Sequence, residues 1–302
     1  MQVFNEINSE NKNLSIALGF FDGIHLGHKA VIGSAVSFAK NNNLKSAVIT
    51  FENHPKCLIN NTEPEYILSK SEKLNILESL GVDYVYFLKF TEELSKLSAR
   101  EYIEFLCNNL EPKAISTGFN HNFGANKDGN SEFLNSIKTK YGFEYFQSPP
   151  VKTDDGEIVS SSKIRESLKQ GNIELVNKML GYNYFINETV IEGEKIGRTI
   201  GFRTANILYP TNLLNIGKGV YSVDVEYNSA QFKGIANFGI RPSLGNTQTP
   251  ILEVHILDFE KDIYGEKILV KFKKKIRDER KFKSLDELKA QITKDVGDAL
   301  WE

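Results

Sequence analysis

The pattern of apolar residues changes once along the chain, and this change limits what the chain can fold into. Up to about residue 184, apolar runs typical of buried strands alternate with segments in which apolar residues recur every three or four positions, as in helices. The alternation predicts an α/β fold, in which a mostly parallel sheet is covered by helices on both faces. Ligands of such sheets bind at the carboxyl ends of the strands.

The first part is expected to contain four strands and five helices. Strands are expected at residues 14–21, 44–51, 83–90 and 113–118, and helices at residues 27–40, 71–80, 98–110, 161–170 and 174–180. Ser98 is a suitable N-cap for the third of these helices, and Glu101 follows three residues later, which is the spacing of a capping box.

Beyond residue 184 the chain alternates apolar and polar residues in short runs separated by turns that contain Gly, Asn or Ser. Strands are expected at residues 185–192, 219–227, 231–238, 250–257 and 267–276, and a closing helix at residues 285–296. Such a series predicts an antiparallel barrel or sandwich. We therefore predict two domains, residues 1–184 and 185–302. The basic run from Lys271 to Lys275 is interpreted mainly as a strand edge that discourages further pairing.

Composition and charge restrict the partners and the cellular location that are expected for the protein. A formal net charge of −2 over 302 residues gives no overall basic field that would draw the chain to nucleic acid or to an anionic membrane. Two cysteines exclude a disulfide framework, and no apolar stretch reaches the roughly 18 residues of a membrane span. Residues 1–11 are polar and do not resemble a secretory signal, so a cytoplasmic location is expected. The oligomeric state is left open.

The segment at residues 19–28 reads Gly-Phe-Phe-Asp-Gly-Ile-His-Leu-Gly-His and joins an expected strand to an expected helix. A helix N-terminus offers unpaired N–H groups to phosphate, and His25 and His28 lie on one side of its first turn. Both imidazoles can donate to phosphate oxygens as charge builds in an in-line displacement. The segment predicts nucleotidyl transfer; the alternative is a strand-to-helix turn with two incidental histidines. The expected ATP contacts are Gly19, Phe20, Phe21, Asp22, Gly23 and Gly27.

Two further segments carry groups that can bind phosphate. Ser161, Ser162 and Arg165 open another expected helix, where hydroxyl groups and a guanidinium can bind phosphate. The alternative is an ordinary Ser N-cap with a solvated arginine. In the glycine-rich run at residues 193–206, Thr204 and Asn206 offer neutral oxygens suited to Mg²⁺ and phosphate, although such runs are often simple turns.

The ordered set of motifs resembles the prokaryotic bifunctional riboflavin kinase/FAD synthetases. In the first part, residues 21–28 resemble the family's Phe-Asp-Gly-x-His-x-Gly-His signature. Other family elements have counterparts at residues 50–55 (Thr-Phe-x-Pro-His-Pro), 97–101 (Leu-Ser-Pro-x-Glu), 118–124 (Gly-x-(Asp/Asn)-Phe-x-Phe-Gly) and 159–165 (Ile-Ser-Ser-Thr-x-Ile-Arg). In the second part, the kinase elements have counterparts at residues 197–206 (Gly-Arg-x-Ile-Gly-Phe-Pro-Thr-Ala-Asn), 219–221, 234–243, 253–255 and 277–282.

The resemblance implies a Rossmann-like nucleotidyltransferase domain followed by a riboflavin kinase barrel. The second domain would phosphorylate riboflavin to FMN with ATP and Mg²⁺, and the first would transfer AMP from a second ATP to FMN, giving FAD and pyrophosphate. His25, His28 and Arg165 would stabilise the AMP transfer, and Glu253 would be the general base on the riboflavin hydroxyl. Thr204 and Asn206 would hold Mg²⁺. Further ATP contacts would be Ser161, Ser162, Gly197, Arg198 and Gly201, and the flavin contacts would be His54, Pro55, Asn120, Phe123, Gly124, Arg277, Glu279 and Phe282.

Four of the departures from the family pattern bear on the expected sites. Asn53 and Arg203 stand where proline is common, His121 replaces a phenylalanine, and Asn130 replaces a frequent aspartate. Arg203 is the most consequential, because proline would fix the backbone just before Thr204. We expect both activities to be present in spite of these changes.

Three other functions are weighed against this one. The chain could retain only the adenylyltransferase, with a barrel that has lost catalysis, or it could be a flavin-binding regulator without turnover. Without a Lys-Met-Ser-Lys-Ser-like loop or an anticodon-sized domain, the sequence disfavours a class I aminoacyl-tRNA synthetase.

Overall fold

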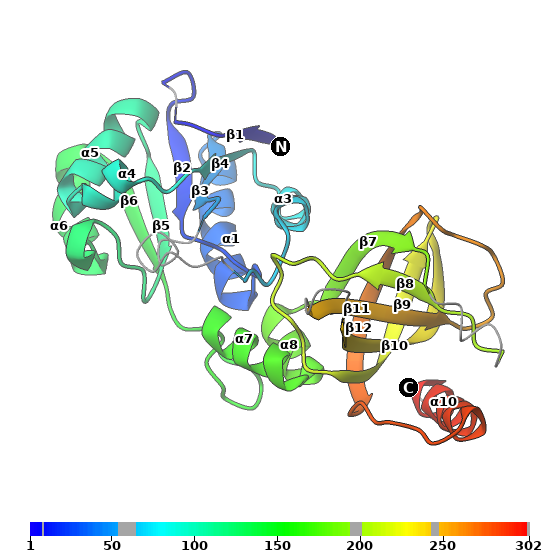
Figure 1. Ribbon diagram of the computed structural model, residues 1–302. Coiled ribbons are helices and arrows are strands. Elements are labelled where there is room, and N and C mark those ends of the chain that lie inside the picture. Colours follow the sequence, from blue (N-terminus) through cyan, green and yellow to red (C-terminus); the bar gives the residue numbers. More distant parts are fainter. Residues whose placement is uncertain (8, 54–64, 194–200, 243–247, 301–302) are drawn as a thin grey trace. The chain divides into compact units, whose positions relative to one another are not determined.

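The computed structural model describes residues 1–302 except residues 8, 54–64, 194–200, 243–247 and 301–302. The chain divides into two compact units, Met1–Ser161 and Ser162–Glu302 (Figure 1). Compactness alone does not define where a functional module ends, so the domain boundary expected between residues 184 and 185 stays a prediction. Among the described helices, none combines the length and apolar character that a membrane crossing requires.

The first unit contains a six-stranded sheet in which every pair of neighbours is parallel, in the order β1-β4-β3-β2-β5-β6 (Figure 1). The strands are β1 (Gln2–Phe4), β2 (Leu14–Leu18), β3 (Lys45–Phe51), β4 (Tyr84–Leu88), β5 (Ala114–Gly118) and β6 (Glu144–Ser148). The predicted parallel sheet is confirmed. The edge strands β1 and β6 were not expected, because three residues at one edge and the polar ends of Glu-Tyr-Phe-Gln-Ser at the other give little apolar pattern.

Helices cover both faces of this sheet. They are α1 (Leu26–Asn41), α3 (Lys70–Ser79), α4 (Glu92–Lys96), α5 (Ala99–Leu110) and α6 (Ser131–Tyr141), with a 3₁₀ turn at Ala125–Lys127. Alternate residues of β2 enter different cores. Ile16 packs with Ile103 of α5 on one face, and Ala17 packs with Ile32 of α1 on the other. The expected capping box is present, since the Glu101 amide donates to Ser98 Oγ (3.3 Å) and the Ser98 amide to Glu101 Oε2 (2.8 Å).

The second unit contains a closed barrel of strand order β10-β11-β8-β7-β12-β9, in which every described pair is antiparallel. Closure decides between the barrel and the sandwich that the sequence left open. Its elements are α7 (Ser161–Gln170), α8 (Ile173–Leu180), β7 (Phe185–Ile191), β8 (Ala205–Leu208), β9 (Gly219–Tyr227), β10 (Ala230–Pro242), β11 (Gln248–Ile256), β12 (Lys267–Arg277) and α10 (Leu285–Leu300). The four-residue strand β8 was not expected.

The basic run lies in β12, and its interpretation as a strand edge is wrong. β12 pairs with β7 on one side and with β9 on the other, so it has no open edge. The lysine side chains instead meet acidic residues of β9. Lys271 Nζ lies 3.0 Å from Glu226 Oε2, and Lys273 Nζ lies 3.7 Å from Asp224 Oδ2. The charges therefore pair across neighbouring strands on the surface of the barrel.

Helix α10 is held against the barrel by a small apolar cluster and an ion pair. Ala299 packs with Val220 and Ile235 of the barrel. Arg277, at the end of β12, donates from Nε and Nη2 to the carboxylate of Asp295 at 3.0 and 2.7 Å. The Asp295 side chain is only 1% exposed, so the pair is shielded from water.

We predict that Asp295→Ala lowers the free energy of unfolding by about 3 kcal/mol, because it leaves the Arg277 guanidinium without its buried counterion. Urea titration followed by circular dichroism measures the change. Asp298→Ala is the control, because Asp298 is exposed on the same helix, and it should stay within about 0.5 kcal/mol of the parent. Equal effects of the two substitutions would contradict a role for the ion pair.

Candidate functional site

The turn between β2 and α1 is strained and buried. Phe21, Gly23 and Ile24 have φ of 52°, 81° and 32°, a region that residues with a side chain rarely adopt. Phe21 is 2% exposed and Ile24 is fully buried, so their side chains are part of the core rather than of the surface. The buried carboxylate of Asp22 accepts the Ile67 amide at 3.0 Å. Backbone strain of this kind persists only where the surroundings determine it, and it is concentrated at functional sites.

Gly19 is required by close packing at the start of this turn. A Cβ atom there would lie 2.8 Å from the ring of Phe21, which real Cβ contacts do not reach. The Gly19 amide donates to the carbonyl of Ile49 at 3.2 Å and so extends the pairing of β2 with β3 by one residue. The turn therefore begins at a fixed point on the carboxyl edge of the sheet.

His25 and His28 lie together at the start of α1. His25 is the N-cap, its Nδ1 accepts the His28 amide at 3.2 Å, and the two rings stack with centroids 3.6 Å apart. Because Nδ1 accepts a hydrogen bond, a neutral His25 carries its proton on Nε2. Burial lowers the pKa of His25 to about 4. At pH 7 this imidazole is therefore an uncharged donor next to the N-terminus of a 16-residue helix.

Six of the predicted ATP contacts, from Gly19 to Gly27, lie in this one turn. Gly27 is close to the His25 ring, since a Cβ there would be 3.1 Å from it. Ser161 Oγ donates to the carbonyl of Asp22 at 3.1 Å and ties the end of the first unit to the same turn. Ser162 and Arg165 lie in α7 and belong to the second unit.

The loop after β5 carries three of the predicted flavin contacts, Asn120, Phe123 and Gly124. Because β5 lies beside β2 and runs parallel to it, this loop leaves the sheet at the same edge as the turn. A Cβ on Gly124, which has φ of 75°, would lie 2.5 Å from the amide of Ala99. That amide donates to the Asp128 carboxylate at 3.1 Å, a bond that the family's proline at this position could not make.

Two of the departures from the family pattern make contacts of their own. Asn53 replaces a proline with a pair of hydrogen bonds. Its Nδ2 donates to the carbonyl of Phe90 at 2.9 Å and its Oδ1 accepts the Phe90 amide at 2.8 Å, which joins the chain after β3 to the chain after β4. His121 stacks on Phe123 with ring centroids 5.7 Å apart. His54 and Pro55 lie outside the described residues.

In the second unit, a polar row crosses three strands of the barrel. Glu253 of β11 lies opposite Asn206 of β8 on one side and opposite Asn237 of β10 on the other. Its sequence neighbours Leu252 and Val254 are fully buried, so Glu253 occupies the opposite, outward face. A Cβ on Gly239 would lie 2.7 Å from Glu279 Oε1, which brings that predicted flavin contact close to the same face.

Asn237 is a residue of this row that the sequence reasoning did not select. It lies inside the segment at residues 234–243 that resembles the kinase family, but an asparagine between apolar strand residues gives no chemical signal alone. Only the register of β10 against β11 shows that it faces Glu253.

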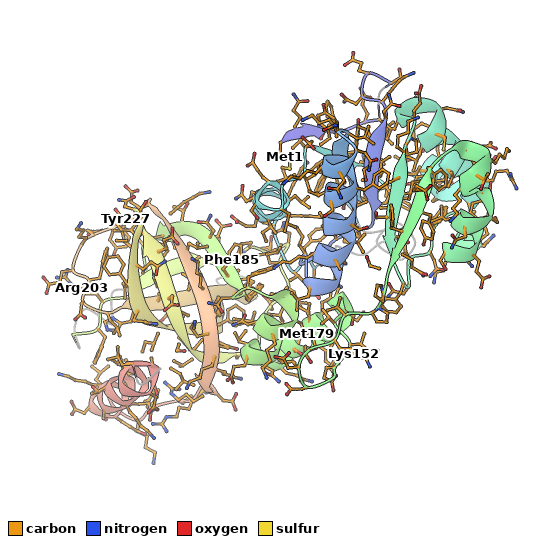
Figure 2. All side chains as sticks on the ribbon, turned by 180° about the vertical axis from the view of Figure 1, so that it is seen from behind. Met1, Lys152, Met179, Phe185, Arg203 and Tyr227 are labelled. Carbon is orange, nitrogen blue, oxygen red and sulfur yellow. The ribbon has the colours of Figure 1, made fainter. Side chains whose placement is uncertain are left out.

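An open hollow lies at Thr204, two residues before Asn206. It is lined, among others, by Arg203, Thr204, Val254, Phe259, Lys261 and Tyr264. Arg203 lies at the periphery of the barrel (Figure 2), where its Nη1 donates to the carbonyl of Glu260 at 2.9 Å. The carbonyl of Arg203 lies 2.7 Å from Nδ1 of His255. Arginine thus links the Thr204 segment to the loop after β11, where proline would only have stiffened the backbone.

The remaining predicted kinase residues are less closely grouped. Arg277 directs its guanidinium to Asp295 of α10, and Phe282 lies under Arg277 and Arg280, with ring centroids 5.7 and 4.8 Å from their guanidinium carbons. Gly201 is exposed. Gly197 and Arg198 lie outside the described residues.

Comparison with known proteins matches one family to each part of the chain. Residues 7–163 match the model of the FAD synthetase family, and residues 180–300 match that of riboflavin kinase. The bifunctional riboflavin kinase/FMN adenylyltransferase of Bacillus subtilis strain 168 is 36% identical over 97% of this chain and 94% of its own length. That of Haemophilus influenzae is 38% identical over 98% and 97%.

A solved structure agrees over the whole chain. The crystal structure of a protein from Streptococcus pneumoniae, described as a macrolide-efflux protein, has a TM-score of 0.90 at 31% identity and covers 99% of this chain and 98% of its own. The FAD synthetase match covers strands β2 to β6 of the parallel sheet, and the riboflavin kinase match covers the barrel. The chain belongs to the family of bifunctional riboflavin kinase/FMN adenylyltransferases, the enzymes that make FMN and FAD.

Proposed function

We propose that AMP transfer from ATP to FMN takes place at the turn of residues 19–28, and that riboflavin phosphorylation takes place at the outward face of the barrel around Glu253. The stacked pair of His25 and His28 at the N-terminus of α1 carries the first assignment. The row of Asn206, Glu253 and Asn237 carries the second. Modules of residues 1–184 and 185–302 would hold the two activities.

In the AMP transfer, an oxygen of the FMN phosphate attacks the α-phosphorus of ATP. A new P–O bond forms, the bond to the β-phosphate oxygen breaks, and its electrons leave with pyrophosphate. Negative charge builds on the α-phosphoryl oxygens, where Nε2–H of His25, His28 and the first amides of α1 can donate hydrogen bonds. The phosphate nucleophile needs no base, so the residues act by position and by stabilising charge. The family resemblance extends this role to Ser161, Ser162 and Arg165, and their roles stay a prediction.

In the kinase reaction, the 5′-hydroxyl oxygen of riboflavin attacks the γ-phosphorus of ATP and ADP leaves. Glu253 would accept the hydroxyl proton as the new bond forms. The hollow beside Thr204, with Val254, Phe259 and the cation of Lys261 in its lining, would take part of the ATP molecule. The other predicted flavin contacts, Glu279 and Phe282, would border the riboflavin, whereas Arg277 would act on it only through its hold on α10.

Magnesium fits the oxygen donors of this face. Thr204 and Asn206 present neutral oxygens near the Glu253 carboxylate, and Mg²⁺ prefers such hard ligands. No group of three His, Cys, Asp or Glu suited to a metal is found in the described part of the chain, so Thr204 and Asn206 would share the ion with the ATP phosphates. When bound, Mg²⁺ would neutralise part of the phosphate charge.

Partners and location follow from the substrates and from composition. Riboflavin, FMN, FAD and ATP are the expected ligands. That the enzyme works in the cytoplasm, without nucleic acid or membrane, stays a prediction that rests on a net charge of −2 and an ordinary soluble composition.

One assay separates this function from its alternatives. The purified chain is incubated with riboflavin or FMN, ATP and Mg²⁺, and the flavins are resolved by chromatography. FAD from either flavin supports both activities. FAD from FMN alone would leave an adenylyltransferase with an inactive barrel, and no conversion of either flavin would leave a flavin-binding protein without turnover.

We predict that His28→Ala lowers kcat for FMN adenylylation by about 10²-fold or more, which is the usual effect of removing one donor to developing charge. Riboflavin phosphorylation by the same variant should be nearly unchanged and serves as the internal control. Chromatographic rates with FMN and with riboflavin measure the two activities separately. An equal loss of both would contradict the assignment of His28 to AMP transfer.

We predict that Glu253→Gln lowers riboflavin phosphorylation by about 10²-fold or more, because the amide cannot accept the hydroxyl proton. FMN adenylylation should persist. Glu266→Gln is the matched control, since Glu266 is exposed in the same unit and just precedes β12, and it should keep both rates. A Glu253 variant with full kinase activity would exclude the carboxylate as the base.

A further inference from the structure

A buried lysine lies directly behind the turn of residues 19–24. Lys73, in α3, is 5% exposed, although it occupies a helix whose other lysine, Lys70, reaches solvent. Lys73 Nζ lies 2.5 Å from the carbonyl oxygen of Phe20 and 2.8 Å from Oγ1 of Thr50. Thr50 Oγ1 in turn donates to the same Phe20 carbonyl at 2.7 Å. The three groups form a closed triangle of hydrogen bonds.

Burying the Lys73 side chain costs free energy, which argues that its hydrogen bonds have a structural role. Burial lowers the pKa of Lys73 to about 7, and the nearby Asp22 carboxylate opposes this shift. The ammonium also lies over the rings of Phe20 and Phe87, 4.9 and 5.1 Å from their centroids. Lysine is almost never fully buried unless it is paired, and leucine or methionine would fill the same space at no such cost.

Lys73 fixes the orientation of one peptide group in the turn. The Phe20–Phe21 peptide is trans, so its carbonyl and its N–H point in opposite directions. With the Phe20 carbonyl directed at Lys73 and Thr50, the Phe21 amide is directed away from them. Phe21 then enters the left-handed conformation that begins the strained turn.

We propose that Lys73 is a positioning residue for AMP transfer, because it holds the Phe20 carbonyl and so sets the direction in which the turn presents its backbone to ATP. This inference rests on the proposed role of residues 19–28 in binding ATP. Lys73 touches no substrate. It acts through Phe20, together with Thr50.

The test compares three variants in FMN adenylylation, with FMN and ATP as the only substrates so that the kinase reaction does not contribute. Lys73→Met keeps the apolar stem and removes the donor. Thr50→Val removes the hydroxyl at nearly constant shape. Leu110→Ala is the structural control, because Leu110 is fully buried at the end of α5 and packs in the core on the other face of the sheet, in a cluster that contains no residue of the turn.

We predict that Lys73→Met lowers kcat/KM for ATP by about ten-fold or more, since a lost hydrogen bond from a charged donor corresponds to at least that factor. KM for FMN and the rate of riboflavin phosphorylation should stay within about two-fold. Thr50→Val should act in the same direction, and the double variant should lose less than the product of the single losses, because both act on one carbonyl.

The outcomes distinguish a positioning role of Lys73 from a merely structural one. Leu110→Ala should lower thermal stability by the large amount typical of a core truncation while KM for ATP stays constant. An unchanged KM and kcat in both Lys73→Met and Thr50→Val, or a Lys73→Met variant that, like Leu110→Ala, loses thermal stability with KM for ATP unchanged, would overturn the proposal. If Lys73→Met does not fold, Thr50→Val decides alone. A parent chain that makes no FAD from FMN would instead overturn the proposed function.

Discussion

The turn between β2 and α1 contains three residues in the left-handed region, Phe21, Gly23 and Ile24, and the rest of the fold must stabilise this strained backbone. Phe21 and Ile24 together cost on the order of 2–6 kcal/mol of backbone strain, so the turn exists only because its surroundings hold it. The buried rings, the Asp22 carboxylate on the Ile67 amide and the Lys73 ammonium on the Phe20 carbonyl supply that support. The histidines at the start of α1 are aligned as a result, because the helix begins where the turn ends.

In the barrel, the positions of the polar side chains are set by strand register rather than by a strained backbone. Asn206, Glu253 and Asn237 come from three strands, β8, β11 and β10, and antiparallel pairing brings them into one row. A slip of one residue in β11 would turn Glu253 into the core and Leu252 outward, so the buried side chains on the inner face also fix which residues occupy the outer face. In this unit, the register that packs the core therefore also sets the arrangement of the polar row.

Local signals in the sequence sufficed for much of the fold. The capping box at Ser98 and the helix after the glycine-bracketed turn depend on neighbouring residues, and they could be predicted. Other features depend on contacts between separate segments of the chain, and composition and periodicity could not predict them. They are the pairing of Lys271 with β9, the position of Asn237 and the burial of Lys73. The His-x-Gly-His turn was recognisable from its spacing, but its strain and the stacking of its imidazoles required the structure.

The uncharged state of His25 has a consequence for turnover. A donor without charge interacts weakly with an ordinary phosphate oxygen and more strongly as charge accumulates there, so its contribution is greatest at the transition state. A cation at the same place would also hold the multiply charged pyrophosphate after the bond has broken. In the proposed AMP transfer, a buried imidazole with a pKa of about 4 would therefore favour departure of pyrophosphate and an early return of the site to its empty state.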